Sequence, residues 1–194
     1  MFEQWVNSYD NYLLHKFVFH RAYSTVFKQI QLSSSVAILD VGCGTGEAAR
    51  FLRKKGFVGK FVGIDPSRKM IRLARLKEGD RRKSKFLIAE AEKLPFASDS
   101  FDYVISTFSM HHWWNPTEAI REIRRVLKPE GRFIIVDIRG DGLIGQIARN
   151  FERLMGSGFD YFNCKQVNSF LTEGNFKNIH YIKTNPIFVS LVVS

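Results

Sequence analysis

The stretch Ile38-Leu39-Asp40-Val41-Gly42-Cys43-Gly44-Thr45-Gly46 decides the fold of this chain. It is a short apolar strand that ends on Asp40 and opens into a loop with glycine at every second position. A helix-compatible stretch, Glu47 to Leu52, follows at once, so the start of a helix would place free N–H groups beside the loop. A ligand can lie against the backbone of the three glycines, because glycine has no Cβ. This pattern predicts a binding site for a nucleoside-like cofactor.

The spacing and charge of the loop indicate which cofactor it suits. A dinucleotide fold has G-x-G-x-x-G, whereas this loop has its third glycine one place early and Glu47 where the last glycine would stand. Glu47 and Asp40 would repel phosphate groups, which disfavours an NAD-dependent oxidoreductase. A P-loop is excluded, since no Gly-Lys-Ser/Thr follows the glycines. An acidic, glycine-lined pocket suits S-adenosylmethionine, which carries a sulfonium and an ammonium group but no phosphate.

Three further blocks accompany the glycine loop: Phe61-Val62-Gly63-Ile64-Asp65-Pro66-Ser67, Ile88 to Phe96 (IAEAEKLPF) and Phe101 to Trp113 (FDYVISTFSMHHW). With these four blocks the chain resembles the class I S-adenosylmethionine-dependent methyltransferases, in the branch of the ubiquinone/menaquinone-type C-methyltransferases. The resemblance runs from about Val36 to Asp137. It implies S-adenosylmethionine as cofactor and S-adenosylhomocysteine as product.

The second block places Asp65 at the end of an apolar run, 23 residues after Gly42. In an open parallel sheet this acid lies beside the first loop, where it can accept hydrogen bonds from both ribose hydroxyls. We therefore expect Asp65 to recognise the ribose and count Pro66 with it. The alternative is that Asp65 caps the helix that begins near Ser67, since Asp and Ser are ordinary N-cap residues.

The third and fourth blocks carry roles that the resemblance implies. Glu90 would accept from the adenine amino group, and the backbone N–H of Ala91 would reach the ring. Ser106 and Thr107 would lie near the methionyl end of the cofactor, and His111 near the mouth of the site. Histidine titrates near neutral pH, so His111 or His112 can take a proton from a substrate or orient it. The alternative is that the two histidines cap the next helix and pack beside Trp113 and Trp114.

Asp137 ends the fifth predicted strand at the edge that faces the substrate, which makes it a candidate general base. It can equally pair with Arg139 or cap the following segment. The candidate catalytic residues are therefore Asp137 and His111, and no metal site is expected. The expected cofactor-binding residues are Asp40, Gly42, Cys43, Gly44, Gly46, Asp65, Pro66, Glu90, Ala91, Ser106 and Thr107.

Short apolar strands that alternate with amphipathic helices predict an α/β fold with a Rossmann-like, doubly wound sheet and helices on both faces. The resemblance implies seven strands, five parallel ones and a C-terminal antiparallel hairpin split by Asn185-Pro186. We expect strands at 36–41, 57–65, 85–89, 101–106, 132–138, 180–184 and 187–193, and a Pro/Gly turn from Lys128 to Gly131 before the fifth of them. We expect helices at 2–31, 47–55, 67–78, 117–127, 143–155 and 165–173.

Length and composition indicate one domain over residues 1–194, because 194 residues with 45% apolar content can bury a sizeable core. We divide it into an N-terminal helical lid (1–32), a cofactor-binding core (36–138), and substrate-side helices with the closing hairpin (139–194). The N-terminal aromatic residues, first of all Trp5, Tyr9 and Tyr12, either roof the site or pack as core. The turns Gly140-Asp141-Gly142 and Gly156-Ser157-Gly158 flank a helix that would form a second wall.

The formal net charge of +10 raises the question of nucleic acid. Half of the positions from Arg68 to Lys85 are Lys or Arg, and Arg68, Arg72 and Arg75 fall on one helical stripe. Such a face can neutralise RNA phosphates or can simply be a solvated helix face. The sequence thus leaves three hypotheses open: a methyltransferase for a small molecule, one for RNA or a protein, and a cofactor-binding regulatory protein without turnover.

Cysteine content and the length of the apolar runs indicate the expected cellular compartment of the protein. Cys43 and Cys164 form neither a disulfide framework nor a metal site. The chain begins without a signal-peptide pattern, and its apolar runs are shorter than the roughly 20 residues of a membrane span. We expect a cytoplasmic protein without a membrane span, and the sequence leaves its oligomeric state open.

Overall fold

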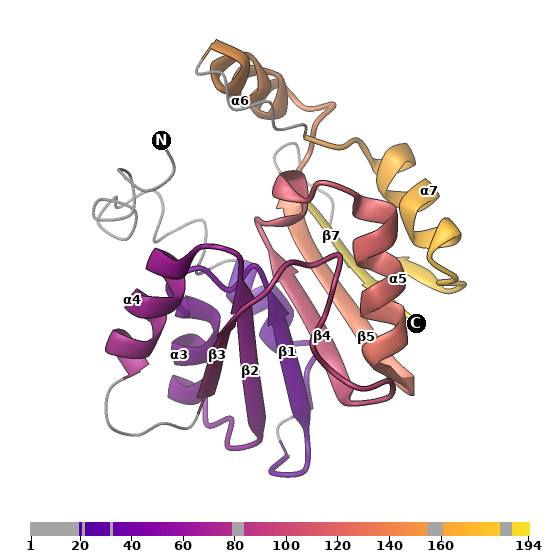
Figure 1. Cartoon of the computed structure of the whole chain (residues 1–194). Coiled ribbons are helices and arrows are strands. Elements are labelled where there is room, and N and C mark those ends of the chain that lie inside the picture. Colours follow the sequence, from indigo (N-terminus) through magenta and orange to yellow (C-terminus); the bar gives the residue numbers. More distant parts are fainter. Residues whose placement is uncertain (1–19, 21, 32, 79–83, 155–160, 183–187) are drawn as a thin grey trace.

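Seven strands form one sheet in the order β3-β2-β1-β4-β5-β7-β6 (Figure 1). The structure, a computed structural model, describes residues 20, 22–31, 33–78, 84–154, 161–182 and 188–194. The five strands from β3 to β5 are parallel, and β7 pairs antiparallel with both β5 and β6. The strands are β1 (Ala37–Val41), β2 (Lys60–Asp65), β3 (Ser84–Ile88), β4 (Phe101–Thr107), β5 (Leu127–Ile138), β6 (Ile179–Tyr181) and β7 (Phe188–Val193). The predicted Rossmann-like sheet with its antiparallel hairpin is confirmed.

Helices cover both faces of the sheet, as Figure 1 shows. They are α3 (Glu47–Lys54), α4 (Arg68–Glu78), α5 (Pro116–Val126), α6 (Leu143–Leu154) and α7 (Cys164–Glu173), with a short 3-10 helix, η2 (Met110–His112). Apolar residues of α3, α4 and the helical residues 22–27 pack on one face, and those of α5 and α7 on the other. None of the described helices is long and apolar enough to cross a membrane.

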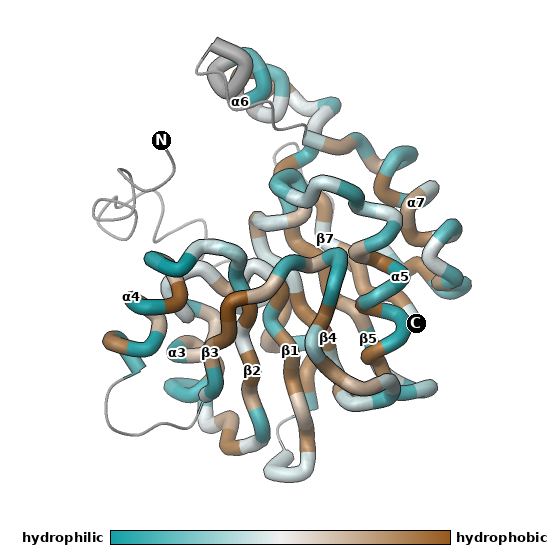
Figure 2. Tube along the Cα trace, viewed as in Figure 1, coloured by the Kyte–Doolittle hydropathy of each residue, from teal (hydrophilic) through white to brown (hydrophobic). Residues whose placement is uncertain are grey.

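The strand β1 lies inside the sheet, between β2 and β4. All five of its residues are buried, because helices cover both of its faces. Figure 2 shows the same pattern as apolar colour along β1 and β4 and polar colour on the outer turns of α4. Because the five parallel strands run in one direction, their carboxyl ends meet at one edge, where η2 and the start of α6 also lie. This edge is where the predicted site residues are expected to gather.

The predicted start of the second strand at Phe57 is wrong, since β2 begins at Lys60. Residues 55–59 instead close the end of α3. The N–H of Phe57 donates to the carbonyl of Leu52 at 3.0 Å. Nη1 of Arg53 donates to the carbonyls of Phe57 and Gly59, both at 2.9 Å. The buried Phe57 ring belongs to the core under this helix end rather than to the sheet.

The prediction of a separate Pro/Gly turn before the fifth strand is also wrong, because β5 already begins at Leu127. Leu127 pairs with Phe101, but Arg132 pairs with Tyr103, so residues 128–131 form a bulge within the strand. Pro129 has no N–H for the ladder, which suits a bulge. The remaining boundaries of the described strands and helices agree with the predictions to within about three residues, except that the N-terminal helix, predicted to run to residue 31, ends at residue 27.

Some predictions fall outside the described residues. These are residues 1–19 of the predicted 1–32 lid with Trp5, Tyr9 and Tyr12, the Gly156-Ser157-Gly158 turn, and the Asn185-Pro186 turn. The division of the chain into lid, core and substrate side therefore stays a prediction. In the described part the Gly140-Asp141-Gly142 segment does precede α6, which extends away from the carboxyl edge of the sheet in Figure 1.

Candidate functional site

The glycine loop between β1 and α3 is held by the end of β2. The N–H groups of Gly42 and Cys43 both donate to the carbonyl of Ile64, at 2.9 and 2.8 Å. The N–H of Gly44 donates to Oδ2 of Asp65 at 3.0 Å. Gly46 follows in a left-handed conformation and is the N-cap residue of α3. The first two predicted blocks therefore meet, as expected for neighbouring parallel strands.

Glycine stands at the three alternating positions of the loop for different physical reasons. All three have positive φ values, 77° at Gly42, 51° at Gly44 and 79° at Gly46. A Cβ at Gly42 would lie 2.3 Å from Cβ of Ser109, and one at Gly46 would lie 2.9 Å from the ring of Phe86. A Cβ at Gly44 would meet nothing within 4 Å. Only Gly44 therefore presents bare backbone to open space, whereas the other two glycines make room for the protein's own side chains.

Two carboxylates lie beside the glycine loop at the carboxyl edge of the sheet: Asp40 in β1 and Asp65 in β2. Asp40 is 1% exposed, and within the described part of the chain its Oδ1 atom has no hydrogen-bond partner. Burial, and secondly the charge of Asp65, raise the pKa of Asp40 from 3.8 to about 8. Burial, followed by the nearby Asp40 and Asp65, also raises the pKa of the Cys43 thiol well above its usual value, so Cys43 remains a neutral thiol.

Asp65 does not itself cap α4, which begins at Arg68 after the N-cap residue Ser67, but it supports that residue in addition to holding the loop. Its Oδ1 accepts from the N–H of Ser67 at 2.9 Å, and the hydroxyl oxygen of Ser67 accepts from the N–H of Met70 at 3.3 Å. Burial raises the pKa of Asp65, and its two backbone hydrogen bonds oppose that shift. Each carboxylate oxygen can accept a second hydrogen bond, so these two bonds do not prevent contact with a ribose. The exposed Pro66 continues this corner.

The third block is a loop after β3 that the helix α5 fastens to the sheet. Nη2 of Arg125 donates to the carbonyl of Leu94 at 3.1 Å, and its Nη1 to that of Phe96 at 2.8 Å. Glu122 accepts from the N–H of Leu94 at 2.8 Å and pairs with Arg125 at 2.6 Å. The loop displays Glu90 as an exposed side chain and buries Ala91. Glu90 is thus accessible to a ligand, and the loop beneath it is held in place.

The fourth block connects the end of β4 to the glycine loop through Ser109. The hydroxyl oxygens of Ser106 and Ser109 lie 2.8 Å apart, and Ser109 Oγ donates to the carbonyl of Val41, also at 2.8 Å. Ser106 and Thr107 are buried at this junction. Phe108 has a φ of 53°, an uncommon value for a residue other than glycine, and there the chain turns from β4 into η2. Strained residues of this kind are concentrated at functional sites.

His111 and Asp137 form a buried pair at the carboxyl ends of β4 and β5. Nδ1 of His111 lies 2.7 Å from Oδ1 of Asp137, and the N–H of His111 donates to Oδ2 of Asp137 at 3.3 Å. Both side chains are 7% exposed. The alternative pairing of Asp137 with Arg139 is wrong, because Arg139 pairs with Asp141 at 2.9 Å. The structure therefore brings the two candidate catalytic residues together.

Neither histidine caps the next helix, contrary to the alternative interpretation. The N-cap of α5 is Asn115, whose side chain accepts from the N–H of Glu118 at 3.1 Å. The ring of His112 lies 4.0 Å from that of His111. Burial and the neighbouring His111 lower the pKa of His112 from 6.5 to about 3, against the opposing effect of Asp137. His112 is thus neutral and too weak a base to take a proton near pH 7.

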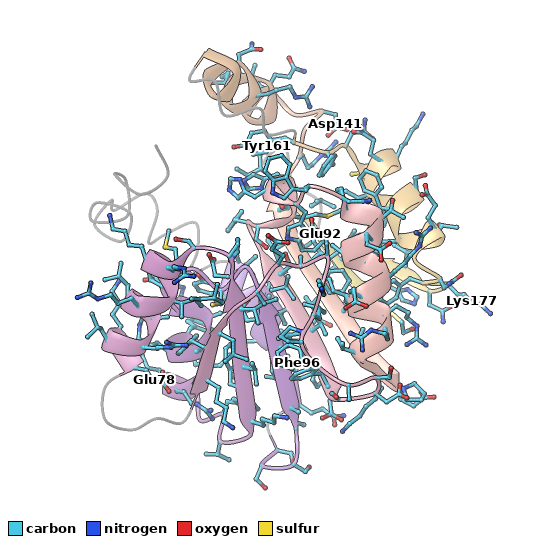
Figure 3. The ribbon with its side chains drawn as sticks, in the orientation of Figure 1. Glu78, Glu92, Phe96, Asp141, Tyr161 and Lys177 are labelled. Atoms are coloured by element: carbon cyan, nitrogen blue, oxygen red, sulfur yellow. The ribbon has the colours of Figure 1, made fainter. Side chains whose placement is uncertain are left out.

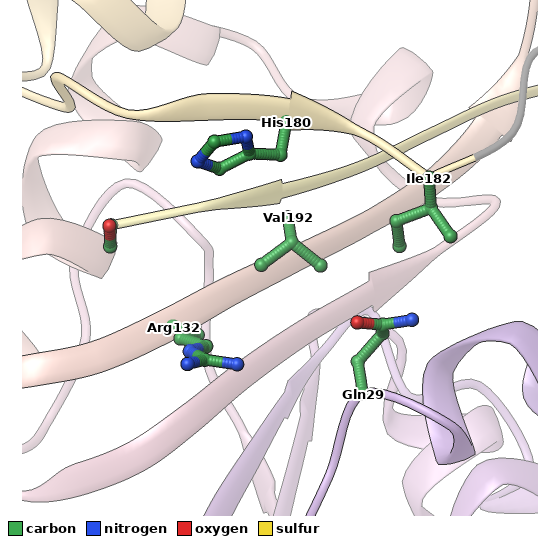
Figure 4. Close-up of a pocket in the computed structure, with 6 residues that line it drawn as sticks. Gln29, Arg132, His180, Ile182 and Val192 are labelled. Atoms are coloured by element: carbon green, nitrogen blue, oxygen red, sulfur yellow. The ribbon is translucent and has the colours of Figure 1, made fainter.

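Two other predicted or visible features lie apart from this edge. Arg75 of the basic stripe donates through Nε and Nη2 to the carbonyl of Phe86, at 3.1 and 2.6 Å. A cavity of about 370 Å³ is lined by Gln29, Arg132, His180, Ile182, Val192 and Ser194 (Figure 4). None of the predicted site residues lines that cavity. Among the described residues no group of three or more His, Cys, Asp or Glu side chains is arranged to hold a metal ion.

Comparison with known proteins identifies the family. Residues 39–135 match the family described as the methyltransferase domain, which is half of the chain. The chain belongs to this family. The methyltransferase is 31% identical to the demethylmenaquinone methyltransferase of Thermotoga maritima over 152 residues, 76% of this chain and 61% of that protein. It is 33% identical to the ubiquinone/menaquinone biosynthesis C-methyltransferase UbiE of Pseudomonas entomophila, over 65% of this chain and 47% of that one.

The fold of the methyltransferase also has solved counterparts. The crystal structure of the YcgJ protein from Bacillus subtilis superposes with a TM-score of 0.75 at 25% identity, and covers 84% of this chain and 71% of that one. These findings confirm the resemblance to the class I S-adenosylmethionine-dependent methyltransferases of the ubiquinone/menaquinone branch. The chain spans about half the length of the curated relatives that it matches.

Two contributors to this edge could not be found from sequence. Ser109 lies between two predicted elements, and no pattern connects it to Val41. Tyr161 stacks on the ring of His111 with centroids 4.6 Å apart and an angle of 28° between the planes. It follows His111 by fifty positions in a segment without regular structure. Only the folded chain brings these residues to the site.

Proposed function

We propose that this protein transfers a methyl group from S-adenosylmethionine to a small-molecule acceptor, with His111 as the general base. The observation that carries the proposal is the arrangement of the carboxyl edge. The glycine loop with Asp40 and Asp65 lies at the ends of β1 and β2, and the His111–Asp137 pair lies at the ends of the adjoining strands β4 and β5. A cofactor site and a proton acceptor thus occupy neighbouring parts of one edge.

The residues at the glycine loop fit a cationic cofactor. Asp40 is buried with an unpartnered oxygen and a pKa of about 8, so a nearby positive charge would favour its ionised form. Open space above Gly44 gives a ligand access to the backbone. Asp65 would bind the ribose hydroxyls, and Glu90 with the N–H of Ala91 would bind the adenine. Ser106 and Thr107 would lie by the methionyl group, and Gly42, Cys43, Gly46 and Pro66 would shape the floor.

The acceptor side supplies orientation and a base. When bound, S-adenosylmethionine supplies a methyl carbon that is already activated by the sulfonium, so an in-line displacement needs mainly alignment. Asp137 holds Nδ1 of His111, which leaves Nε2 as the proton acceptor. Nε2 would take the hydroxyl proton of the acceptor, which leaves an electron-rich oxygen or ring carbon to bond to the methyl carbon, while the electron pair of the carbon–sulfur bond would remain on sulfur. A methylated ring carbon would then release its own hydrogen as a proton.

The names of the relatives support a hydroxylated aromatic acceptor. Two relatives are named demethylmenaquinone methyltransferase and ubiquinone/menaquinone biosynthesis C-methyltransferase, so their names refer to quinones. The reduced form of a quinone carries ring hydroxyl groups, and loss of a hydroxyl proton makes such a ring electron-rich. The contacts of Arg75 argue against RNA, because this member of the basic stripe binds a backbone carbonyl of β3. A small, flat acceptor with an ionisable hydroxyl is therefore our proposal for the substrate class.

The cofactor part of the proposal is tested by calorimetry with S-adenosylhomocysteine. We expect Asp65→Ala to weaken binding at least tenfold, because the ribose would lose its acceptor and Gly44 its anchor. Glu130→Ala, an exposed carboxylate in the bulge of β5, serves as the charge-matched control and should leave the affinity unchanged. Equal affinities for all three proteins would overturn the assignment of Asp65.

Turnover separates an enzyme from a regulatory binding protein. We would measure release of S-adenosylhomocysteine with a panel of hydroquinones, naphthohydroquinones and phenols, and in parallel with total RNA. Turnover on a member of the panel that falls at least a hundredfold in His111→Ala, with unchanged cofactor affinity, supports the proposal. Tight cofactor binding with no turnover on the panel, or turnover on RNA alone, would contradict it.

A further inference from the structure

The aromatic ring of Tyr161 covers one face of the proposed base. Tyr161 is 7% exposed and lies face to face with the imidazole of His111, 4.6 Å between centroids. In Figure 3 it lies between the carboxyl edge of the sheet and α6. The ring of His112 lies near His111 as well, but at an angle of 48°. Tyr161 therefore provides the flat wall against which the imidazole rests.

A wall of this kind fixes a degree of freedom that Asp137 leaves open. The 2.7 Å contact between Nδ1 and Oδ1 fixes the position of one ring nitrogen. It does not fix the tilt of the ring about that contact, because terminal torsions of histidine are broad. Stacking on a second ring restricts this tilt and thereby the direction of Nε2. A general base needs that direction, since proton transfer requires a nitrogen within hydrogen-bond reach of the acceptor.

Tyr161 is itself held by α6. Nη2 of Arg149 donates to the carbonyl of Tyr161 at 2.7 Å and to the carbonyl of Gly140 at 3.0 Å. The N–H of Gly140 donates to the carbonyl of Phe162 at 2.9 Å. These three hydrogen bonds join the chain just before α6 to the chain just before α7. The two ends of the segment between Gly140 and Tyr161 are thus fastened to each other, and the ring of Tyr161 stacks on His111.

We propose that Tyr161 is the positioning residue of the His111 base, and that Arg149 holds Tyr161 in place. This inference rests on the proposed function, since it assigns a role to Tyr161 only if His111 accepts the proton. Tyr161 acts through its ring rather than its hydroxyl group. The helix α6 therefore contributes to the acceptor side of the site through the position of the base, whatever its own contact with the acceptor.

The test compares variants that keep or remove the ring. Tyr161→Phe keeps the stack, and Tyr161→Leu removes it. Tyr181→Leu is the matched control, because Tyr181 is 42% exposed and bonds to Asn168 of α7 instead. Arg149→Met keeps the apolar stem but removes both hydrogen bonds, and Asn150→Ala on the exposed side of α6 is its control. Circular dichroism and the affinity for S-adenosylhomocysteine establish that each variant is folded with an intact cofactor site.

The first measurement is the NMR line width of the His111 ring signals in the free protein, which needs no acceptor. We expect Tyr161→Leu to broaden these signals at least twofold, and Arg149→Met to broaden them to a smaller extent, because the ring then samples more than one tilt. Tyr161→Phe and both controls should match the wild type. Unchanged line widths of the His111 ring in folded Tyr161→Leu would overturn the inference.

The second measurement is the pH profile of kcat and KM on the acceptor that the panel yields. We expect Tyr161→Leu to lower kcat at least tenfold and to move its acidic limb, and Tyr161→Phe to restore both to within twofold. Broadened His111 ring signals with an unchanged kcat would show that Tyr161 positions a histidine that is not the base. The proposed role of His111 in catalysis would then be wrong, and the role of Tyr161 in the reaction with it.

Discussion

Replacement of Asp40 by Asn is the perturbation that tests the cofactor site most directly. Asp40 is 1% exposed in β1, and its raised pKa of about 8 means that the native protein keeps a proton there at neutral pH. In the unfolded chain the same group has its ordinary pKa of 3.8. Asparagine has nearly the same shape but cannot ionise. The difference in stability between the two proteins therefore isolates the titration of one carboxyl group.

The sign and size of the effect follow from proton linkage. Between pH 3.8 and about 8 the native state binds more protons at Asp40 than the unfolded state does, so the stability of the wild type falls as the pH rises. The slope approaches about 1.4 kcal/mol per pH unit for a single group. The wild type should thus lose about 4 kcal/mol relative to Asp40→Asn between pH 4 and pH 7. The stability that Asp40 contributes is fully present below pH 3.8 and is lost as the pH passes through about 8.

The assay is urea denaturation of both proteins at half-unit steps from pH 4 to pH 8.5. Asp102→Asn is the control, because burial raises the pKa of Asp102 but Lys128 at 2.7 Å and two backbone hydrogen bonds lower it below the ordinary value. Asp102 is therefore ionised in both states above about pH 5, so the stability of Asp102→Asn should run parallel to that of the wild type from there to pH 8.5. Parallel stability curves for the wild type and Asp40→Asn would refute the reasoning about Asp40.

The same group predicts a pH dependence of cofactor affinity. A bound cation favours ionised Asp40, so binding of S-adenosylmethionine expels the proton. Between pH 6 and pH 7.5 the affinity of the wild type should therefore rise by up to tenfold per pH unit. The Asp40→Asn protein should bind more weakly, with an affinity that varies little over this range. Calorimetry in buffers of different ionisation enthalpy measures the released proton directly, and a wild type that releases none would contradict this coupling.

Three further predictions concern the supports of the site. Gly42→Ala should destabilise the protein by about 3 kcal/mol, because its Cβ would lie 2.3 Å from that of Ser109, whereas Gly44→Ala should destabilise it less and mainly weaken binding of S-adenosylhomocysteine; chemical denaturation and calorimetry compare the two, and equal effects on stability would contradict the packing argument. Arg125→Met should weaken cofactor binding severalfold in calorimetry, because the loop with Glu90 and Ala91 loses its bonds to the carbonyls of Leu94 and Phe96, and an unaltered affinity would show that the loop is held otherwise. Arg75→Met should lower the free energy of unfolding, measured by urea denaturation, by about 1 to 2 kcal/mol, because the carbonyl of Phe86 loses its hydrogen bonds. RNA retention on a filter should not change, whereas a selective loss of RNA binding would support the RNA hypothesis.

The sequence predicted the parallel sheet well because its signals are local. The buried run of β1 and the glycines after it fix both a strand and a turn, and the acid 23 positions after Gly42 marks the next strand of the same edge. The boundaries were wrong where burial and sheet pairing diverge. Phe57 is apolar and buried like a strand residue, yet it fills the core below α3. Pro129 and Gly131 resemble a separate turn, yet they lie in a bulge of β5.

The sequence could name candidate residues for the site but not the contacts between them. Asp65 and the loop glycines could be placed together, because adjacent parallel strands end at the same edge. The pairing of His111 with Asp137 spans 26 positions and depends on the turn at Phe108, which no propensity indicates for a phenylalanine. Tyr161 and Ser109 depend on contacts between distant segments, for which periodicity carries no information. Local sequence patterns thus identify candidate residues, and only tertiary packing shows which of their atoms are in contact.

The energetic position of Asp40 is the strongest argument that this edge binds a cation. A buried carboxyl group with an unpartnered oxygen and a like charge close by lowers the stability of the free protein at neutral pH. A methyl group in its place would avoid this cost, and among the described residues none donates a hydrogen bond to the Oδ1 atom. The cost is offset only when a positive ligand arrives, because the ionised form is then stabilised by the ligand rather than by water. The free protein is thus less stable than it would be with an apolar residue at position 40. A cationic cofactor relieves this cost, whereas neutral or anionic ligands, which the same glycine loop would admit on shape alone, do not.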